Sequence, residues 1–242
     1  MRRIIAAISL VCSTLFLSTI ALTASLVYDK GLVIHRLAHF WAFLHLKLCG
    51  IRVLSKGTEN LLKPPYIIMS NHQSALDIFV LYIALPFLFK WVAKRQLFSI
   101  PFVGWIMKRA SYISLDRESP RDGLKAINDA AQKIREGMNI IVFPEGTRSS
   151  DGKLLPFKKG VFSLAVRAGV PVIPIGINGT SRLQPKGSLM PLEKGAIYVN
   201  IGKPILIGGD KASEKARIMD EVRLSIEKLM ANNEGILIDS RG

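Results

Sequence analysis

The chain has 242 residues, a length typical of one domain with a short additional segment. Hydrophobic residues make up 49% and charged residues 21%, which excludes an intrinsically disordered chain, because disorder requires low hydrophobicity. Lys and Arg number 33 against 18 Asp and Glu, and the formal net charge of +15 favours an anionic partner such as a phosphorylated compound, an anionic membrane or nucleic acid. Cys12 and Cys49 are too few for a disulfide scaffold or a cysteine-rich metal site.

The N-terminal segment is predicted to anchor the chain to a membrane. Residues 4–28 contain no charged side chain, and as a helix they would extend about 37 Å, more than the roughly 30 Å of a bilayer's hydrocarbon core. A cleaved secretory signal is the alternative, but the run is longer than the ~7–15 apolar residues of a signal core. Several Ser and Thr residues interrupt its hydrophobicity, so a shallow or re-entrant helix stays open beside a spanning one.

A second apolar segment follows at residues 32–49. It carries aromatic residues of the kind that lie at the level of lipid headgroups. We therefore expect an apolar hairpin of two helices in one leaflet, with residues 1–60 as a membrane anchor and residues 61–242 as the main domain. His35 and His39 are spaced like a metal-binding pair, but no third ligand lies nearby in the sequence, so packed histidines are favoured and no metal site is expected.

Beyond residue 60, short β-branched runs alternate with amphipathic stretches. Strands are predicted at residues 66–70, 112–115, 139–143, 170–177 and 196–201. Helices are predicted from about residue 74, at 119–136, at 158–168 and after residue 213. Because alternating strands and helices form parallel sheets, the sequence predicts an α/β fold, with a mostly parallel or mixed sheet flanked by helices and preceded by the apolar helical hairpin.

The unusual polar residues follow the predicted strands, where ligands bind in open α/β sheets. His72 lies between the first of these strands and the next helix, and it is the only histidine outside the first sixty residues. Asp77 falls in the first turn of that helix and could accept the Nδ1 proton of the imidazole, which would leave Nε2 able to take a proton. Ser74 and Asp77 also match an acidic variant of a helix capping box, and the spacing alone leaves both interpretations open.

Basic residues at corresponding places indicate a phosphate pocket. Arg148 lies in the turn at residues 144–149, Arg117 follows its own predicted strand, and Lys94 lies in the connection between strands. An arginine in such a turn can form bidentate hydrogen bonds with a phosphate. Any one of these residues alone is more often a solvated surface charge, so the indication depends on their combination.

Motifs of several other chemistries are absent from the sequence. The chain has no G-x-S-x-G, no G-x4-G-K-[ST], no G-x-G-x-x-G, no C-x-x-C and no H-E-x-x-H. A His–Asp pair without a nucleophile beside it favours direct attack by a substrate hydroxyl, with no covalent enzyme intermediate. Nucleic acid is disfavoured as the partner, because no reading motif is recognisable and the basic residues are scattered.

Four ordered blocks resemble the glycerolipid acyltransferase family. Asn71–Asp77 is similar to its N-H-x4-D signature, and Phe143–Ser149 is similar to its second hallmark. Ser114–Arg117 resembles the intermediate block of the family, and Val170–Pro174 resembles its proline-containing last block. The four blocks span roughly residues 65–180, and a single H-x4-D would be far less specific.

The resemblance implies an acyltransferase with His72 and Asp77 as catalytic residues. His72 would deprotonate the free hydroxyl of 1-acyl-sn-glycerol 3-phosphate (lysophosphatidic acid). The oxygen would attack an acyl thioester of coenzyme A or acyl carrier protein, which would give phosphatidic acid. The acceptor- and phosphate-binding residues that the resemblance implies are Lys94, Arg117, Glu145, Gly146, Thr147 and Arg148.

Glu145 would then orient a hydroxyl or Arg148, and backbone N–H groups around Gly146 could form an oxyanion hole. No cofactor is implied, because the thioester is already activated. Two other interpretations stay open: acyl transfer to another lysophospholipid or to a glycerol 3-phosphate-like acceptor, and a basic protein that binds membrane lipid without catalysis.

The resemblance also implies a location at the cell membrane. Because the acceptor carries a long acyl chain and resides in the bilayer, residues 61–242 are expected to form the catalytic domain on the cytoplasmic face, with membrane lipid as a partner. Apolar and basic residues are interleaved at residues 94–109 and indicate a second membrane-touching patch. Ordinary core packing is the alternative interpretation of this segment.

Overall fold

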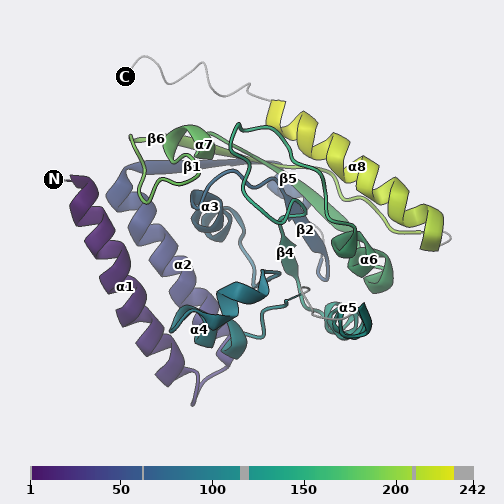
Figure 1. Cartoon of the computed structure of the whole chain (residues 1–242), viewed down its shortest axis with the longest axis horizontal. Coiled ribbons are helices and arrows are strands. Elements are labelled where there is room, and N and C mark those ends of the chain that lie inside the picture. Colours follow the sequence, from purple (N-terminus) through teal and green to yellow (C-terminus); the bar gives the residue numbers. More distant parts are fainter. Residues whose placement is uncertain (1, 62, 115–119, 209–210, 232–242) are drawn as a thin grey trace.

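Six strands form one mixed sheet at the centre of the computed structural model, which describes residues 2–61, 63–114, 120–208 and 211–231 (Figure 1). In spatial order the strands are β1 (Ile51–Lys56), β6 (Gly195–Ile201), β5 (Val172–Asn178), β2 (Ile67–Ser70), β4 (Ile140–Val142) and β3 (Lys90–Trp91). Every neighbouring pair is parallel except β5 and β6, which are antiparallel. The predicted α/β fold with a mostly parallel sheet is confirmed.

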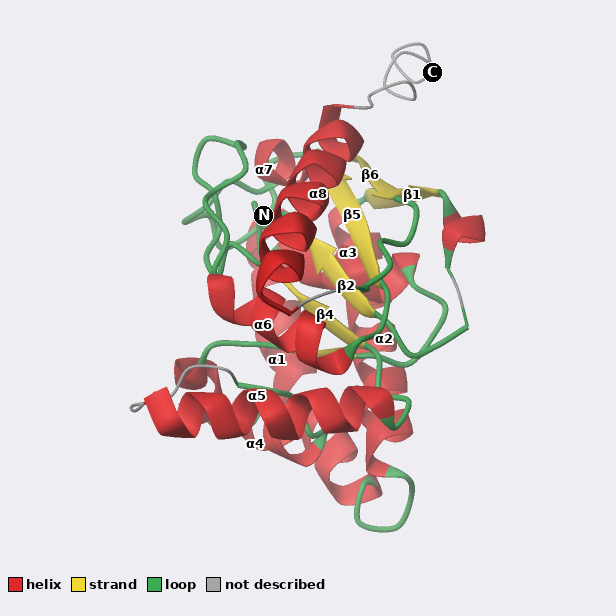
Figure 2. Cartoon of the chain, turned by 90° about the vertical axis from the view of Figure 1, so that its right-hand side faces the viewer, coloured by secondary structure: helices red, strands yellow, loops and turns green. Residues whose placement is uncertain are grey.

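Both faces of the sheet are covered by helices, which explains why its central strands are almost continuously apolar. Ile68 of β2 packs with α3 (Leu76–Ala84) on one face, and Ile67 of the same strand packs with α5, α6 and α8 on the other. These three helices are Pro120–Arg135, Lys159–Ala168 and Lys211–Ala231. Figure 2 shows α6 and α8 in front of the strands. Successive residues of β2 thus point to opposite faces, and both are fully buried.

The long C-terminal helix α8 lies directly on strand β5. A Cβ at Gly176 in β5 would come within 2.6 Å of the Leu229 Cβ in α8, a distance that real side chains do not adopt. Glycine at this position therefore allows the close approach of helix and strand.

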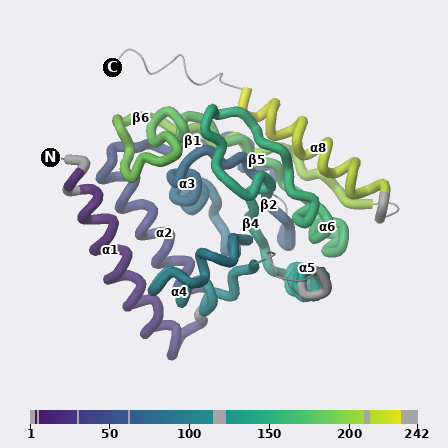
Figure 3. The backbone as a smooth tube through the Cα atoms, viewed as in Figure 1, coloured from purple at the N-terminus to yellow at the C-terminus, as the bar shows by residue number. Residues whose placement is uncertain are grey.

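The two N-terminal helices form the predicted hairpin. α1 (Arg2–Ala24) and α2 (Lys30–Cys49) run side by side, on the side of the molecule away from α8 (Figures 1 and 3). Asp29 begins α2, because its Oδ1 accepts the backbone N–H of Leu32 at 2.8 Å. Trp41 of α2 stacks on Phe79 of α3, with ring centroids 4.5 Å apart, so the hairpin packs against the helix that follows β2.

Three details of the strand prediction differ from the structure. The strand predicted at residues 112–115 is wrong: Ile113 forms only an isolated bridge with Val92, and residue 115 lies outside the described part of the chain. β3 and β1 are absent from the prediction. β1 belongs to the sheet although it precedes residue 60, where the sequence places the end of the anchor; the division into an anchor and a catalytic domain stays a prediction.

Candidate active site

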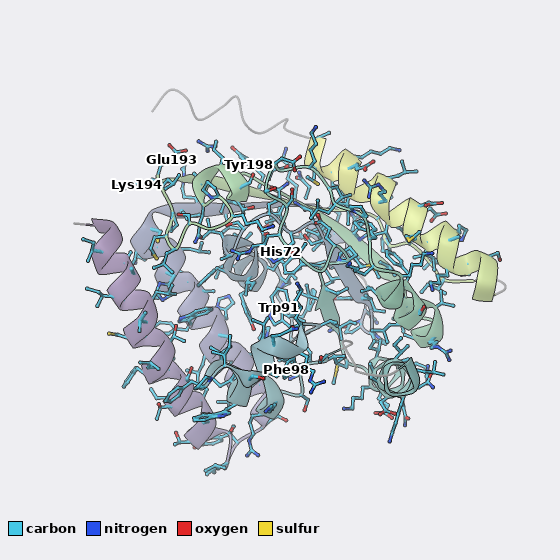
Figure 4. All side chains as sticks on the ribbon, in the orientation of Figure 1. His72, Trp91, Phe98, Glu193, Lys194 and Tyr198 are labelled. Atoms are coloured by element: carbon cyan, nitrogen blue, oxygen red, sulfur yellow. The ribbon has the colours of Figure 1, made fainter. Side chains whose placement is uncertain are left out.

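The candidate site lies at the carboxyl end of β2. Asn71, the first residue after the strand, is buried, and its side chain accepts the backbone N–H of Ile177 at 2.7 Å and donates to the Ile177 carbonyl at 2.9 Å. The amide thus takes the place of a backbone pair between β2 and β5, and the chain can leave the sheet at His72. Figure 4 shows His72 near the middle of the molecule, with Glu193 and Lys194 at its periphery.

The structure brings His72 and Asp77 together, as the sequence analysis expects. His72 Nδ1 lies 2.8 Å from Asp77 Oδ2, and the Asp77 side chain is fully buried whereas that of His72 is 15% exposed. The same oxygen also accepts the backbone N–H groups of Gln73 and Ser74 at 2.7 and 2.9 Å. The spacing left helix capping and pairing with His72 as alternatives for Asp77. The structure shows that its Oδ2 atom does both.

These contacts define the chemical state of the imidazole. A carboxylate only accepts hydrogen bonds, so Nδ1 of His72 donates to Asp77 and Nε2 keeps its lone pair. Nε2 can therefore take a proton from a hydroxyl, and the resulting imidazolium would face the Asp77 charge.

Phe143, the residue after β4, forms one wall of the site. Its ring stacks on the His72 imidazole, with the ring centroids 3.9 Å apart and an angle of 7° between the planes. It also packs against the Trp91 ring of β3, with 5.6 Å between the ring centroids. Phe143 belongs to one of the four family blocks in the sequence, but no role was predicted for it. The available signal was an aromatic residue at the end of a buried strand parallel to β2.

Glu145 is almost completely buried and reaches the backbone of His72. Oε1 accepts the His72 N–H at 2.7 Å, and Oε2 accepts the Leu155 N–H at 2.7 Å. Burial raises the pKa of the Glu145 carboxyl above its ordinary value, and the two backbone N–H donors oppose that shift. Both oxygens are directed to backbone groups, which differs from the expected role of orienting a hydroxyl or Arg148.

The turn after β4 also contacts the His72 loop through its backbone. Gly146 adopts φ +68°, a left-handed conformation that favours glycine, and its N–H donates to the Phe143 carbonyl at 3.0 Å. This N–H therefore closes the turn, which argues against it as an oxyanion-hole donor. Ser149 N–H donates to the His72 carbonyl at 2.8 Å. The turn thus holds the backbone of His72.

The expected phosphate-binding residues lie at this same edge of the sheet where they are described. Arg148 is half-buried and Thr147 is exposed, both in the turn after β4. Lys94 is exposed and follows β3, whose carboxyl end meets that of β4 because the two strands are parallel. Arg117 lies outside the described residues. Lys186, which no sequence pattern indicated, donates from Nζ to the Arg148 carbonyl at 2.7 Å.

Metal ligands do not gather at this site. Among the described residues, no group of three or more His, Cys, Asp and Glu side chains lies close enough together to hold a metal ion. His35 instead packs edge-on against Phe89, with ring centroids 4.7 Å apart.

Known proteins share both the sequence blocks and the fold. The family described as Acyltransferase matches residues 52–178. A chloroplastic 1-acyl-sn-glycerol-3-phosphate acyltransferase of Brassica napus is 38% identical over 198 residues, which are 81% of this chain and 56% of the relative. The 1-acyl-sn-glycerol-3-phosphate acyltransferase alpha of Mus musculus is 32% identical over 215 residues, which are 88% of this chain and 75% of the relative.

The fold of this chain also matches that of an acyltransferase whose crystal structure is known. The 1-acyl-sn-glycerophosphate acyltransferase PlsC of Thermotoga maritima matches with a TM-score of 0.72 and 29% identity, over 96% of this chain and 98% of that chain. This chain spans about half the length of several curated relatives, 56% of the Brassica protein and 55% of the Saccharomyces cerevisiae protein. The family match covers His72, Asp77 and Glu145 together with the strands that position them. The chain belongs to the acyltransferase family.

Proposed function

We propose that this protein transfers an acyl group from an acyl thioester to the free hydroxyl of 1-acyl-sn-glycerol 3-phosphate, which gives phosphatidic acid. The observation that carries the proposal is the His72–Asp77 pair, 2.8 Å apart at the carboxyl edge of the sheet. The names of the Brassica and mouse relatives support this choice of acceptor.

The chemistry follows from the proton positions in the pair. His72 Nε2 takes the proton of the acceptor hydroxyl while that oxygen bonds to the thioester carbonyl carbon. The tetrahedral intermediate then expels the sulfur, which takes the proton back from the imidazolium and leaves as a thiol. Asp77 holds the ring in the required tautomer and stabilises the imidazolium between the two steps.

The acceptor's phosphate would lie among the cations at the same edge. Arg148 offers a planar pair of donors, and Lys94 adds a positive charge from the end of β3. The Thr147 hydroxyl is exposed beside Arg148 and can donate a further hydrogen bond. In this proposal Glu145 and Gly146 shape the turn that presents these groups, and Arg117 stays a candidate from the sequence alone.

The hairpin would hold the site at the membrane surface. Within the described residues, α1 contains the one helical stretch long and apolar enough to cross a membrane, Ala6–Ala24, with a mean hydropathy of 1.9. Large apolar side chains on one side of this helix are exposed: Ile4, Ile8, Val11, Leu15 and Phe16. The Thr14 hydroxyl donates to the Leu10 carbonyl at 2.6 Å, so it presents no unpaired donor to lipid.

Polar contacts between the two helices favour a hairpin over a single isolated span. Ser13 Oγ lies 2.8 Å from His45 Nε2, and Trp41 Nε1 donates to Thr14 Oγ1 at 3.1 Å. A hairpin returns the chain to the side from which it entered, which is compatible with a catalytic domain on the cytoplasmic face of the cell membrane.

The segment after β3 also exposes apolar side chains, but they are only partly the ones that the sequence indicated. Trp105 in α4 (Val103–Arg109) is 51% exposed, and Leu97, Ile100 and Val103 nearby are also exposed. Met107 is buried, so core packing is the correct interpretation for that residue. The exposed members would contact lipid alongside α1.

The test is turnover by the purified protein in lipid nanodiscs. Lysophosphatidic acid is supplied with palmitoyl-coenzyme A or with palmitoyl acyl carrier protein, and phosphatidic acid and free thiol are measured together. Parallel reactions contain glycerol 3-phosphate or lysophosphatidylcholine as the acceptor. We expect equal amounts of phosphatidic acid and thiol with at least one donor. Binding of lysophosphatidic acid without thiol release would contradict the proposal and support the non-catalytic alternative.

A further inference from the structure

The backbone of His72 is held from both sides by one short segment. Its N–H donates to Glu145 and its carbonyl accepts the Ser149 N–H, at 2.7 and 2.8 Å. Its ring lies on Phe143 of the same segment. The peptide groups on either side of the His72 Cα are therefore both fixed by the turn after β4, while the side chain is fixed by Asp77.

Glu145 links this arrangement to a second loop. Its carboxylate joins the N–H of His72 to the N–H of Leu155, and only 2% of the residue is exposed. Because each oxygen of Glu145 faces one N–H donor, both oxygens must accept a hydrogen bond. An ionised carboxylate has two such acceptor oxygens. Arg223 of α8 donates to the carbonyls of Leu154 and Leu155 at 3.3 and 3.2 Å, so the second loop is itself anchored to a helix.

We propose that Glu145 is a positioning residue for catalysis, which acts through the backbone of His72 and does not bind the acceptor. The inference rests on the proposed function, because it assigns a role within that reaction. Loss of the Glu145 contact would free the peptide N–H of His72. The Nε2 atom would then shift relative to the acceptor hydroxyl, whose position is set independently by the groups that bind the phosphate. Displacements of about 1 Å at a reacting group lower rates by about 10²-fold.

A direct role in acceptor binding fits the contacts less well. Both oxygens of Glu145 are engaged at short distance by backbone donors, and the residue is nearly inaccessible to solvent. An acceptor hydroxyl that bound there would have to displace one of these donors. The displaced N–H would then be buried without a partner, at a cost of about 1–3 kcal/mol.

The diagnostic substitution is Glu145→Gln. It keeps the size of the side chain but replaces one acceptor oxygen by a donor NH2 group, which must then face one of the two backbone N–H groups. Glu214→Gln is a matched control, because Glu214 is also buried and accepts a backbone N–H, that of Gly208 at 2.7 Å, in helix α8. Unfolding temperatures of both variants measure the purely structural effect.

Steady-state kinetics separate the two roles. If Glu145 positions His72, Glu145→Gln lowers kcat by about tenfold or more and leaves the KM for lysophosphatidic acid within about twofold. Glu214→Gln keeps the wild-type kcat even if it lowers the unfolding temperature as much. An increase in KM with an unchanged kcat would overturn the inference. Should Glu145→Gln not fold, Glu145→Asp gives the same comparison, because the shorter side chain cannot reach both N–H groups.

A spectroscopic measurement makes the inference independent of turnover. The chain contains four histidines, which are labelled isotopically, and the labelled protein is placed in nanodiscs for NMR. The Nδ1 proton of His72, hydrogen-bonded to Asp77, should give a strongly downfield signal that disappears in Asp77→Asn. We expect Glu145→Gln to shift or broaden this signal and Glu214→Gln to leave it unchanged. An unaltered signal in Glu145→Gln would overturn the positioning role, whether or not wild-type protein makes phosphatidic acid. Absent turnover in wild-type protein would instead refute the proposed function.

Discussion

The imidazole of His72 lies flat against the ring of Phe143, with 3.9 Å between the centroids. The face of an aromatic ring carries negative potential, so this arrangement favours the imidazolium that forms when His72 takes a proton. The contact joins the ends of two parallel strands and gives the base a defined orientation.

Phe143→Leu is therefore expected to lower kcat. Leucine keeps the apolar contact but removes the aromatic face, and a cation–π contribution of about 0.5–1 kcal/mol corresponds to a fall of about two- to fivefold. Turnover at saturating lysophosphatidic acid measures the effect. Phe87→Leu is the control, because Phe87 packs on Tyr66 at 5.1 Å and touches no proposed catalytic group. Equal turnover in Phe143→Leu and wild type would refute a role for the aromatic face.

Arg148→Ala should chiefly raise the KM for lysophosphatidic acid. A charged hydrogen bond to phosphate contributes about 1.5–3 kcal/mol, which corresponds to an increase of about ten- to a hundredfold. Lys194→Ala, at the periphery of the molecule in Figure 4, removes the same charge away from His72 and should leave KM unchanged. If the two variants had the same KM, Arg148 would not bind the phosphate.

Asn71→Ala should destabilise the fold more than it alters substrate binding. Its side chain pairs with both the N–H and the carbonyl of Ile177, and removal would leave these buried groups without partners. We expect the free energy of unfolding to fall by about 2–4 kcal/mol, as measured by urea denaturation. Asn128→Ala, on the exposed face of α5, should change it by less than about 0.5 kcal/mol. Similar values for the two variants would mean that the Asn71 pair contributes little.

His35 makes the stability depend on pH. Burial, together with the nearby charges of Lys90 and His39, lowers the pKa of His35 to about 4. In the unfolded chain, His35 takes up a proton near its ordinary pKa of about 6.5. In the folded protein it does so only near pH 4. Stability is therefore expected to fall as the pH drops from 6.5 towards 4, with little further loss from this group below pH 4.

The comparison that checks this expectation is the urea midpoint of wild type and His35→Phe at pH 7 and pH 4.5. Phenylalanine retains the ring packing against Phe89 but cannot take up a proton. The midpoint of His35→Phe should fall less between the two pH values than that of wild type. His39→Phe removes one of the charges that lower the His35 pKa, so its midpoint should fall no more than that of wild type. An equal loss in His35→Phe and wild type would contradict the assignment.

Local patterns in the sequence contained the fold class and the central pair of the site. The spacing of His72 and Asp77 around a predicted helix start indicated that they could meet, because only five positions separate them, but it left a helix-capping role for Asp77 open as the alternative. Tyr112 and Ile113 have high strand propensity, yet Tyr112 is used in a hydrogen bond with the Tyr82 hydroxyl, 2.7 Å away, and no ladder forms. β3 has only two residues, too few for any periodicity.

The supporting contacts could not be predicted in this way. Glu145 and His72 are 73 positions apart, and only the parallel pairing of β2 and β4 brings them to one edge. The same pairing brings Phe143 to His72, and Lys186 lies 38 positions from the Arg148 carbonyl that it contacts. A glutamate in a turn three positions before an arginine is typical of an exposed polar residue, so its burial against the His72 backbone is visible only in the three-dimensional structure.

Turnover by His72→Ala tests the central claim most directly. The variant is purified beside wild type, its unfolding temperature is measured to show that it is folded, and phosphatidic acid formation is compared at saturating lysophosphatidic acid and acyl thioester. Loss of a general base should lower kcat by about 10²–10⁴-fold. A folded His72→Ala protein that kept more than about a tenth of wild-type turnover would contradict the role of His72 as the base.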